Sequence, residues 1–383
     1  MEWKEVRLGD VCTRVCSGGT PKSTNLSYYG GEIPWLNTKE IDFNRIYSTE
    51  KTITDSGLNN SSAKWIVPNT VTVAMYGATA GKSCIVKVPM TTNQACCNLT
   101  INDEVADYEF IYYSLKNDYT TLASLTNGGA QQNLNAQIIK DYVLKMPSLA
   151  DQRRITSILS SLDRKIELNN KINADLEEMA QAIFKNWFVD FEPFKDGKFV
   201  DSELGMIPEG WKVGLLGELC NFKRGKNLLT KNAIDEGVPV VAGGLEPSCY
   251  HNIANTGAPV ITVSGSGANA GFMRMYHVPV WASDCSFIDI SCENFFFVYC
   301  FLKVNSKLLK HAQTGAVQPH VKPSDIHDFE LVIPDEESIY DFQDKVKPFF
   351  DRIASLQKEN SRLSSLRDTL LPRLMSGELE VPE

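Results

Sequence analysis

Two stretches of the chain carry apolar residues at the alternating steps of four and three that define a coiled-coil seam. In the first, from Asp151 to Val189, these steps join Ile155, Leu159, Leu162, Ile166, Asn169, Asn173, Leu176, Ala180, Ile183 and Trp187. In the second, near the C-terminus, they join Phe342, Val346, Phe349, Ile353, Leu356, Asn360, Leu363, Leu370 and Leu374, with Arg367 as the one departure. Each helix needs a partner along its seam, so we predict that the two pack on each other.

Both predicted helices contain polar seam residues, and the second also contains prolines. A buried Asn is costly without a polar partner, so Asn169 or Asn173 opposite Asn360 would fix one register of the helix pair. Pro348 and Pro372 lie in the second stretch, where proline removes a helical hydrogen bond. We expect a kink or a helix boundary at each of them.

The chain consists of one pattern that occurs twice. The opening Trp3-Lys4 matches Trp211-Lys212 at an offset of 208, and the turn at 77–81 matches that at 267–271 at an offset of 190. From Tyr112 onward the offset is 187, and seven apolar seam positions of the first helix fall on seam positions of the second. The repeating unit is therefore one globular domain followed by one long helix.

These landmarks give a mixed α/β (α+β) fold with two globular domains related by an internal repeat and two long helices. We place the first globular domain at 1–150, the central helix and linker at 151–207, the second globular domain at 208–335 and the C-terminal helix at 336–383. The linker ends in the Pro/Gly turn Met206–Gly210. Short strands are expected at 71–75, 85–88, 260–263, 278–282 and 329–333, whereas 108–115 and 295–302 fit either a helix or a strand.

Composition indicates a soluble cytoplasmic protein. The chain is 43% hydrophobic and 22% charged, has no apolar run long enough to cross a bilayer and begins without a signal-peptide pattern. Its ten cysteines form no CxxC pair, so we expect reduced core cysteines and no metal site. The net charge of −9 is weak evidence against nucleic acid, because the two globular stretches are each close to neutral.

No catalytic motif survives comparison of the two copies. The turn at 77–81, followed by Lys82-Ser83, resembles a phosphate-binding loop but is one residue short, and its counterpart at 267–271 lacks both Lys and Ser. A methyltransferase tetrapeptide, a nuclease carboxylate set and helicase motifs are absent from the sequence. All five histidines lie in the second half, which favours surface or core roles over a repeated catalytic one.

The polar loops are better candidates for binding phosphates and base edges, since Asn and Gln can contact adenine bidentately. Any single loop residue is equally well explained as solvated surface. The candidate nucleic-acid contacts are Thr20, Lys22, Asn25, Tyr76, Thr79, Lys82, Gln131, Gln132, Lys223, Arg224, Lys226, Ser266, Asn269, Arg274, Gln318 and His320.

An aromatic stripe at the end of the first helix extends beyond the seam. Such a stripe is more often core, but its repetition in the second helix predicts two equivalent patches for two copies of a partner. The candidate partner contacts are Phe184, Trp187, Phe188, Leu370, Leu371 and Leu374.

The chain resembles the specificity (S) subunits of type I restriction-modification enzymes over its whole length. The resemblance is carried by the duplicated layout and by four runs: 17–21 (Ser-Gly-Gly-Thr-Pro), 176–191, 207–211 and 366–378. The second half departs from it at Lys223–Lys226, which replaces the Gly-Gly-Thr-Pro loop.

The resemblance implies a non-catalytic DNA reader. Each globular unit would be a target recognition domain for one half of an asymmetric bipartite site, and an antiparallel helix pair would set the gap. Two modification subunits carrying S-adenosylmethionine would methylate adenine at N6, and restriction subunits with ATP and Mg²⁺ would cleave DNA. The chain itself would hold no cofactor or metal.

Two other classes of function remain open from the residues alone. One is a stand-alone DNA methyltransferase or nuclease with an unrecognised site, which would bind S-adenosylmethionine or cut DNA unaided. The other is an adaptor that joins two protein copies without touching DNA.

Overall fold

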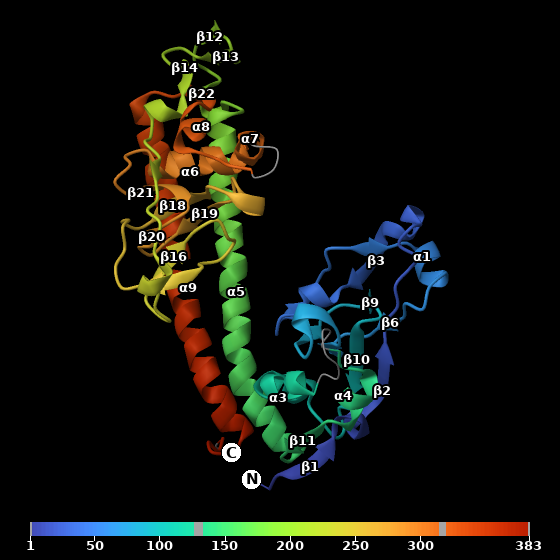
Figure 1. The fold of residues 1–383 in the computed structure, drawn as a ribbon. Helices are drawn as coiled ribbons and strands as arrows, with labels where there is room; N and C mark the ends of the chain where they lie inside the picture. Colours follow the sequence, from blue (N-terminus) through green and yellow to red (C-terminus); the bar gives the residue numbers. More distant parts are fainter. Residues whose placement is uncertain (1, 126–132, 314–318, 382–383) are drawn as a thin grey trace. The chain divides into compact units, whose positions relative to one another are not determined.

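The computed structural model describes residues 2–125, 133–313 and 319–381 and divides the chain into two compact units. Unit 1 comprises Met1–Glu167 and Asn360–Glu383, and unit 2 comprises Leu168–Glu359. Each unit contains a mixed α/β domain and segments of both long helices (Figure 1). The fold is therefore mixed α/β, as the sequence predicts.

The globular part of unit 1 is built on a five-stranded sheet. Its strand order is β2 (Cys12–Ser17), β10 (Cys96–Ile101), β7 (Val71–Ala74), β8 (Ser83–Val86) and β4 (Arg45–Ile46). A four-stranded sheet has the order β5 (Thr52–Ile53), β3 (Tyr29–Leu36), β9 (Met90–Thr92) and β6 (Trp65–Ile66), and β1 (Lys4–Arg7) pairs with β11 (Val143–Met146). The helices are α1 (Asp55–Asn59), α2 (Tyr108–Asn117), α3 (Tyr119–Ser124) and α4 (Ala136–Asp141).

Unit 2 repeats much of this plan. Its four-stranded sheet has the order β15 (Lys223–Arg224), β21 (Cys285–Asp289), β18 (Val260–Ser264) and β19 (Met273–Tyr276), which matches β2, β10, β7 and β8. The smaller sheets are β17 (Cys249–His251), β16 (Val238–Val241) and β20 (Trp281–Ala282); β14 (Lys212–Leu215) and β22 (Glu330–Ile333); and β12 (Phe199–Ser202) and β13 (Gly205–Pro208). Helices α6 (Phe295–Val304), α7 (Ser306–His311) and α8 (Pro323–His327) correspond to α2, α3 and α4.

Several local expectations are settled by these elements. The two ambiguous segments are the helices α2 and α6. The strand expected at 278–282 is shorter, since β20 comprises only Trp281–Ala282. The turn expected at Met206–Gly210 is instead mostly strand, because Met206 to Pro208 belong to the β12–β13 hairpin.

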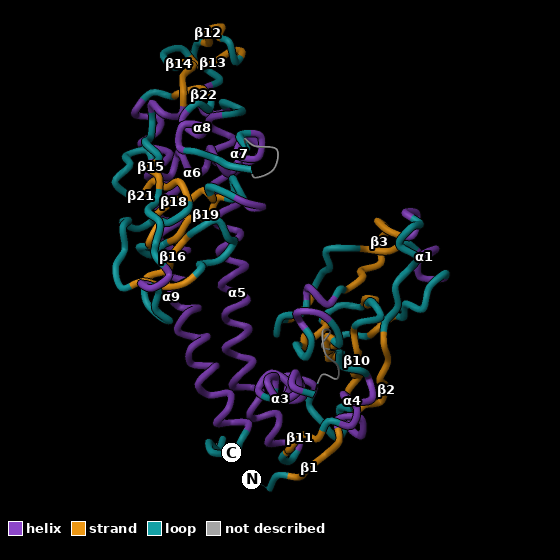
Figure 2. Tube along the Cα trace, viewed as in Figure 1, coloured by secondary structure: helices purple, strands orange, loops and turns teal. Residues whose placement is uncertain are grey.

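The long helices α5 (Leu149–Phe188) and α9 (Glu336–Met375) each have 40 residues and run through both units (Figure 2). In unit 1, Ile155 and Leu159 of α5 join a core with Leu374 of α9. In unit 2, Phe184 of α5 joins a core with Phe342 of α9. Within each unit the start of one helix thus packs beside the end of the other, as an antiparallel pair requires.

The prolines do not end helix α9. The helix begins at Glu336 and continues through Pro348 and Pro372, so the expected helix boundaries were wrong. Both prolines lie on the exposed face, where water can satisfy the carbonyl that loses its helical donor. In the seam, the buried Asn169 donates from its amide to Glu359 Oε2 at 2.9 Å, and its pairing with Asn360 stays a prediction.

Candidate nucleic-acid interface

A glycine-bounded turn follows the central strand of the main sheet in each unit. It comprises Gly77–Gly81 after β7 and Gly267–Gly271 after β18, and all four terminal glycines have φ between 76° and 85°. Gly81 N–H donates to Ala74 O, and Gly271 N–H donates to Ser264 O, both at 2.9 Å. The resemblance to a phosphate-binding loop is thus explained by a tight turn that needs left-handed glycines.

A second matched feature lies where the edge strands β2 and β15 end. Gly18 N–H donates to Cys96 O at 3.3 Å, and Gly225 N–H donates to Cys285 O at 2.8 Å. A Cβ on either glycine would lie 2.1 Å from a backbone oxygen, so neither position accepts a side chain. The next carbonyl accepts an indole N–H in both units, from Trp35 at 2.9 Å and from Trp281 at 2.8 Å.

A third matched feature brings a distant segment to the turn. Leu134 N–H donates to Met75 O in unit 1, and Val321 N–H donates to Gly265 O in unit 2. The residues beside these bonds form isolated bridges, Tyr76 with Asn133 and Ser266 with His320. Each unit therefore holds the same backbone frame, which we call the recognition frame: the strand-end glycine, the glycine-bounded turn and the returning segment.

In unit 1, the candidate residues are spread around this frame. Lys82 Nζ lies 2.6 Å from Asp42 Oδ1, and Thr79 donates to the carbonyl of Thr38 at 2.9 Å. Thr20 donates to Gln94, whereas Asn25 accepts from Ser27 N–H at 3.2 Å and caps a short helix. Lys22 and Tyr76 are exposed. Asn25 thus has a local structural role, and the others present polar groups at the surface.

In unit 2, several candidates meet at one carboxylate. Arg224 Nη2 lies 2.5 Å from Asp284 Oδ1, and Ser266 Oγ donates to Asp284 Oδ2. Asn269 does not contact this carboxylate, and its Nδ2 donates to Gly243 O at 3.4 Å. No pattern in the sequence pointed to Asp284, whose counterpart in unit 1 is Ala95.

The other unit 2 candidates surround this group or lie apart from it. Lys223 and Lys226 are exposed on either side of Arg224 and Gly225. Arg274 is held by Glu246 at 3.0 Å and lies 5.1 Å from the ring centroid of Tyr276. Gln131, Gln132 and Gln318 lie outside the described residues.

The structure accounts for the proposed partner stripe as core. Phe184 and Phe188 are buried against Phe342 in unit 2, and Leu371 and Leu374 are buried in the core of unit 1. Trp187 and Leu370 are partly buried against the same cores. These six residues therefore hold the helices to their own globular domains, and their role as partner contacts stays a prediction.

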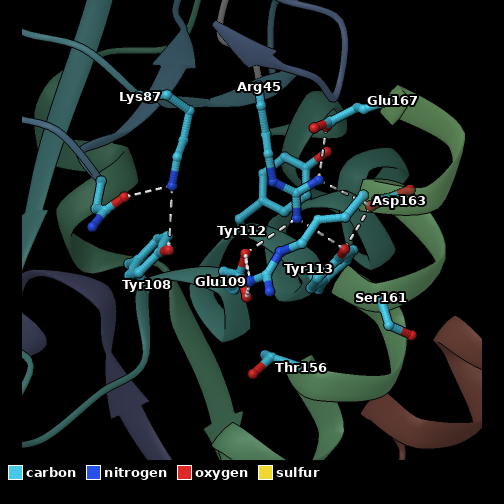
Figure 3. Close-up of polar contacts among 12 residues, drawn as sticks. Arg45, Lys87, Tyr108, Glu109, Tyr112, Tyr113, Thr156, Ser161, Asp163 and Glu167 are labelled. Atoms are coloured by element: carbon cyan, nitrogen blue, oxygen red, sulfur yellow. Dashed lines mark hydrogen bonds and ion pairs between the residues drawn. The ribbon is translucent and has the colours of Figure 1, made fainter. Parts of the chain in front are cut away.

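Sequence reasoning missed a buried ionic cluster that fastens β4 and α2 to helix α5 in unit 1 (Figure 3). The guanidinium of Arg45, whose side chain is 3% exposed, lies 3.2 Å from Glu109 and 3.0 Å from Glu167. It also lies 3.8 Å from Asp163. The hydroxyl of Tyr113 donates to Asp163 at 2.5 Å.

Two further arginines extend this cluster. Arg164 contacts Glu109 at 3.1 Å, and Arg367 of helix α9 contacts Asp163 at 2.7 Å. Burial and the neighbouring Asp163 raise the pKa of Tyr113, so its hydroxyl stays a donor at neutral pH. The contact with Asp163 explains why Arg367 interrupts a seam that otherwise contains apolar residues and Asn360.

Several of the equivalent positions in unit 2 are apolar, although Arg164 corresponds to Asp351. At the offset of 187, Glu109 corresponds to Phe296, Asp163 to Phe350, and Ala180 of α5 to Arg367 of α9. The rings of Phe296 and Phe350 are stacked with centroids 4.9 Å apart and an interplanar angle of 8°. At these positions the buried contacts are thus ionic in unit 1 and aromatic in unit 2, although α6 also contacts α5 through Lys303 and Glu177 at 2.9 Å.

A family model for the type I restriction modification DNA specificity domain matches residues 1–178 and again 208–363. The chain belongs to this family. It carries two copies of the specificity domain, and family membership makes it a non-catalytic specificity subunit. Across the described ranges, no group of three or more His, Cys, Asp or Glu side chains could hold a metal ion, and no helix is long and apolar enough to span a membrane.

Related proteins match most or all of the chain. The MjaIX type I specificity subunit of Methanocaldococcus jannaschii is 30% identical over 100% of this chain and 94% of its own length. The HindI specificity subunit of Haemophilus influenzae is 26% identical over 71% of this chain and 77% of its own length. The crystal structure of an S subunit from M. genitalium has a TM-score of 0.60 at 19% identity, covers 100% of this chain and 97% of that one, and supports the fold.

Proposed function

We propose that the chain is the sequence-specific DNA-recognition subunit of a type I restriction-modification complex, with residues 1–150 and 208–335 as its two target recognition domains. Each domain reads one half of an asymmetric bipartite site. The observation that carries this proposal is the repeated recognition frame, which keeps its backbone bonds in both units and changes its exposed polar side chains. A shared frame with different side chains suits two related but unequal half-sites.

We propose that the antiparallel pair α5–α9 sets the gap between the half-sites. Two readers on one face of B-DNA contact successive major grooves about 34 to 36 Å apart, and two helices of 40 residues are long enough to span that separation. Inserting one heptad in both helices, in register, should lengthen the gap and leave both half-sites unchanged. Altered half-sites with the original gap would contradict a ruler.

We also propose the division of labour within the complex. Two modification subunits supply S-adenosylmethionine and methylate adenine at N6, and restriction subunits supply ATP- and Mg²⁺-dependent cleavage. This chain contributes base specificity and holds no cofactor. Its partners would contribute much of the phosphate contact, which agrees with the acidic net charge of −9.

Genome-wide adenine methylation tests the proposal. Cells that express the chain with its modification subunit should show one bipartite methylated motif, and cells that lack the chain should not. If the motif disappears without the chain although the modification subunit is fully active, the chain is the subunit that recognises the DNA sequence. If the motif is unchanged without the chain, an adaptor role is favoured, and if the purified chain alone methylates or cuts DNA, the enzyme alternative holds.

A further inference from the structure

Arg224 ends strand β15 at a point where the backbone is fixed. It is paired with Ser286 of β21, and the next residue is Gly225, which lies against Ser283 O too closely for any side chain. The Cα of Arg224 is therefore fixed by the sheet before it and by the recognition frame after it. About half of the side chain, 47%, stays exposed.

The guanidinium itself is also held. Nη2 contacts Asp284 Oδ1 at 2.5 Å. Asp284 is fixed in turn, since its other oxygen accepts from Ser266 and its carbonyl accepts from Gly265 N–H at 3.1 Å. An arginine restrained in this way loses little conformational entropy when it binds.

The chemistry of this group favours a base over a phosphate. A carboxylate beside the guanidinium offsets the positive charge that would attract a phosphate, but it still leaves the planar fork of N–H donors. The O6 and N7 atoms of guanine are two uncharged acceptors that match this fork in the major groove. The exposed Lys223 and Lys226 on either side are better suited to phosphates.

The equivalent positions in unit 1 have different chemistry. The matched backbone bonds of Gly18 and Gly225 make Ser17 the counterpart of Arg224 and Ala95 the counterpart of Asp284. Tyr76 is the counterpart of Ser266 through the two isolated bridges. An arginine held by a carboxylate at these positions thus occurs in unit 2 but not in unit 1, as a device that reads one half-site requires.

We infer that Arg224 reads a guanine in the half-site of the second domain and that Asp284 is the positioning residue that fixes its guanidinium. This inference rests on the proposed function. It adds the identity of one base and the residues that select it.

The test uses the full chain with its modification subunit and compares methylated motifs for wild type, Arg224→Lys, Arg224→Ala and Asp284→Ala. Arg224→Lys keeps the charge but loses the fork, so preference for one G·C pair should fall by about 10- to 100-fold. The other half-site and the gap should not change. Asp284→Ala should relax the same base pair to a smaller extent.

Arg7→Ala is the matched control, because Arg7 of β1 forms a surface ion pair with Asp141 of α4 in the other unit. It should leave the motif unchanged. Unfolding temperatures and assembly of the purified complexes separate lost specificity from lost folding.

A wild-type motif without a G·C pair in either half-site would overturn the inference. An Arg224→Lys variant that keeps full guanine preference would also overturn it. So would a variant that methylates all sequences equally less, because that result indicates a phosphate contact. Failure of the proposed function is distinguishable, because then the wild-type chain itself would direct no bipartite motif.

Discussion

The two units solve the same packing problem with opposite chemistry. Unit 1 fastens its globular domain to the long helices through Arg45, Glu109 and Asp163, whereas unit 2 uses the stacked rings of Phe296 and Phe350 at the matching positions. Buried ions need their partners, since removal of one leaves an uncompensated charge. Buried aromatic rings instead stabilise the contact through close packing and the apolar area that they remove from water. The repeat therefore fixes where the helix is held and leaves the kind of interaction free to differ.

The largest expected effect comes from moving the chemistry of unit 1 into unit 2. Phe350→Asp would lose a ring that is 2% exposed and bury a carboxylate near Ala180, where unit 1 has Arg367. We expect at least about 5 kcal/mol of lost stability in unit 2. Amide hydrogen exchange in helix α6 measures it, with α2 as the internal reference. Unchanged exchange in α6 would contradict the comparison.

Removing the central cation of unit 1 should be nearly as costly. Arg45→Met leaves Glu109, Asp163 and Glu167 without their shared partner, and we expect about 3 to 5 kcal/mol of lost stability in unit 1. Protection of backbone amides from hydrogen exchange should fall in α2 and stay unchanged in α6. The matched control is Lys39→Ala, which breaks an exposed pair with Glu50 and should change neither helix.

The contact between helices in unit 1 can be isolated by a double-mutant cycle. Arg367→Ala and Asp163→Asn should each destabilise unit 1, and the pair should be non-additive by about 1 to 3 kcal/mol. Urea unfolding followed by exchange in α2 supplies the four values. Strict additivity would show that Arg367 acts through solvent rather than through Asp163.

The smallest effect concerns pH. Burial holds the pKa of His277 in unit 2 below its ordinary value of 6.5, although Glu177 and Asp351 act to raise it. Because the folded pKa is depressed, the contribution of His277 to stability is present above about pH 6.5 and declines as the pH falls through the folded value. His277→Gln should remove this part of the acid dependence in unit 2 and leave unit 1 unaffected. Identical acid profiles for variant and wild type would exclude the linkage.

Much of the fold could be predicted from one sequence because it depends on local periodicity and on self-similarity. The seam positions indicated both long helices, and the matched offsets indicated the repeat. Strand order could not be predicted, since β10 pairs with β2 and β7 across long sequence separations. Helix α6 was ambiguous because Phe295 to Leu302 are all buried, which removes the polar face that reveals a helical period.

The candidate site was predictable only in outline. The glycine turns and polar loops stood out as residues, but the role of Asp284 required its contact with Arg224, 60 positions away in the chain. Arg367 was visible as an exception, and its cause, Asp163, lies 204 positions away. The aromatic stripe was assigned to partners because periodicity shows that a face is apolar but not what covers it.

The recognition frame is held by backbone atoms and glycines rather than by the side chains that it displays. A codon change at Arg224, Ser266 or their counterparts in unit 1 leaves every hydrogen bond between backbone atoms of the frame intact. Two copies of such a frame in one polypeptide allow each to mutate without consequence for the other. Under the proposed function, a new half-site then requires only a few nucleotide substitutions in one half of the gene.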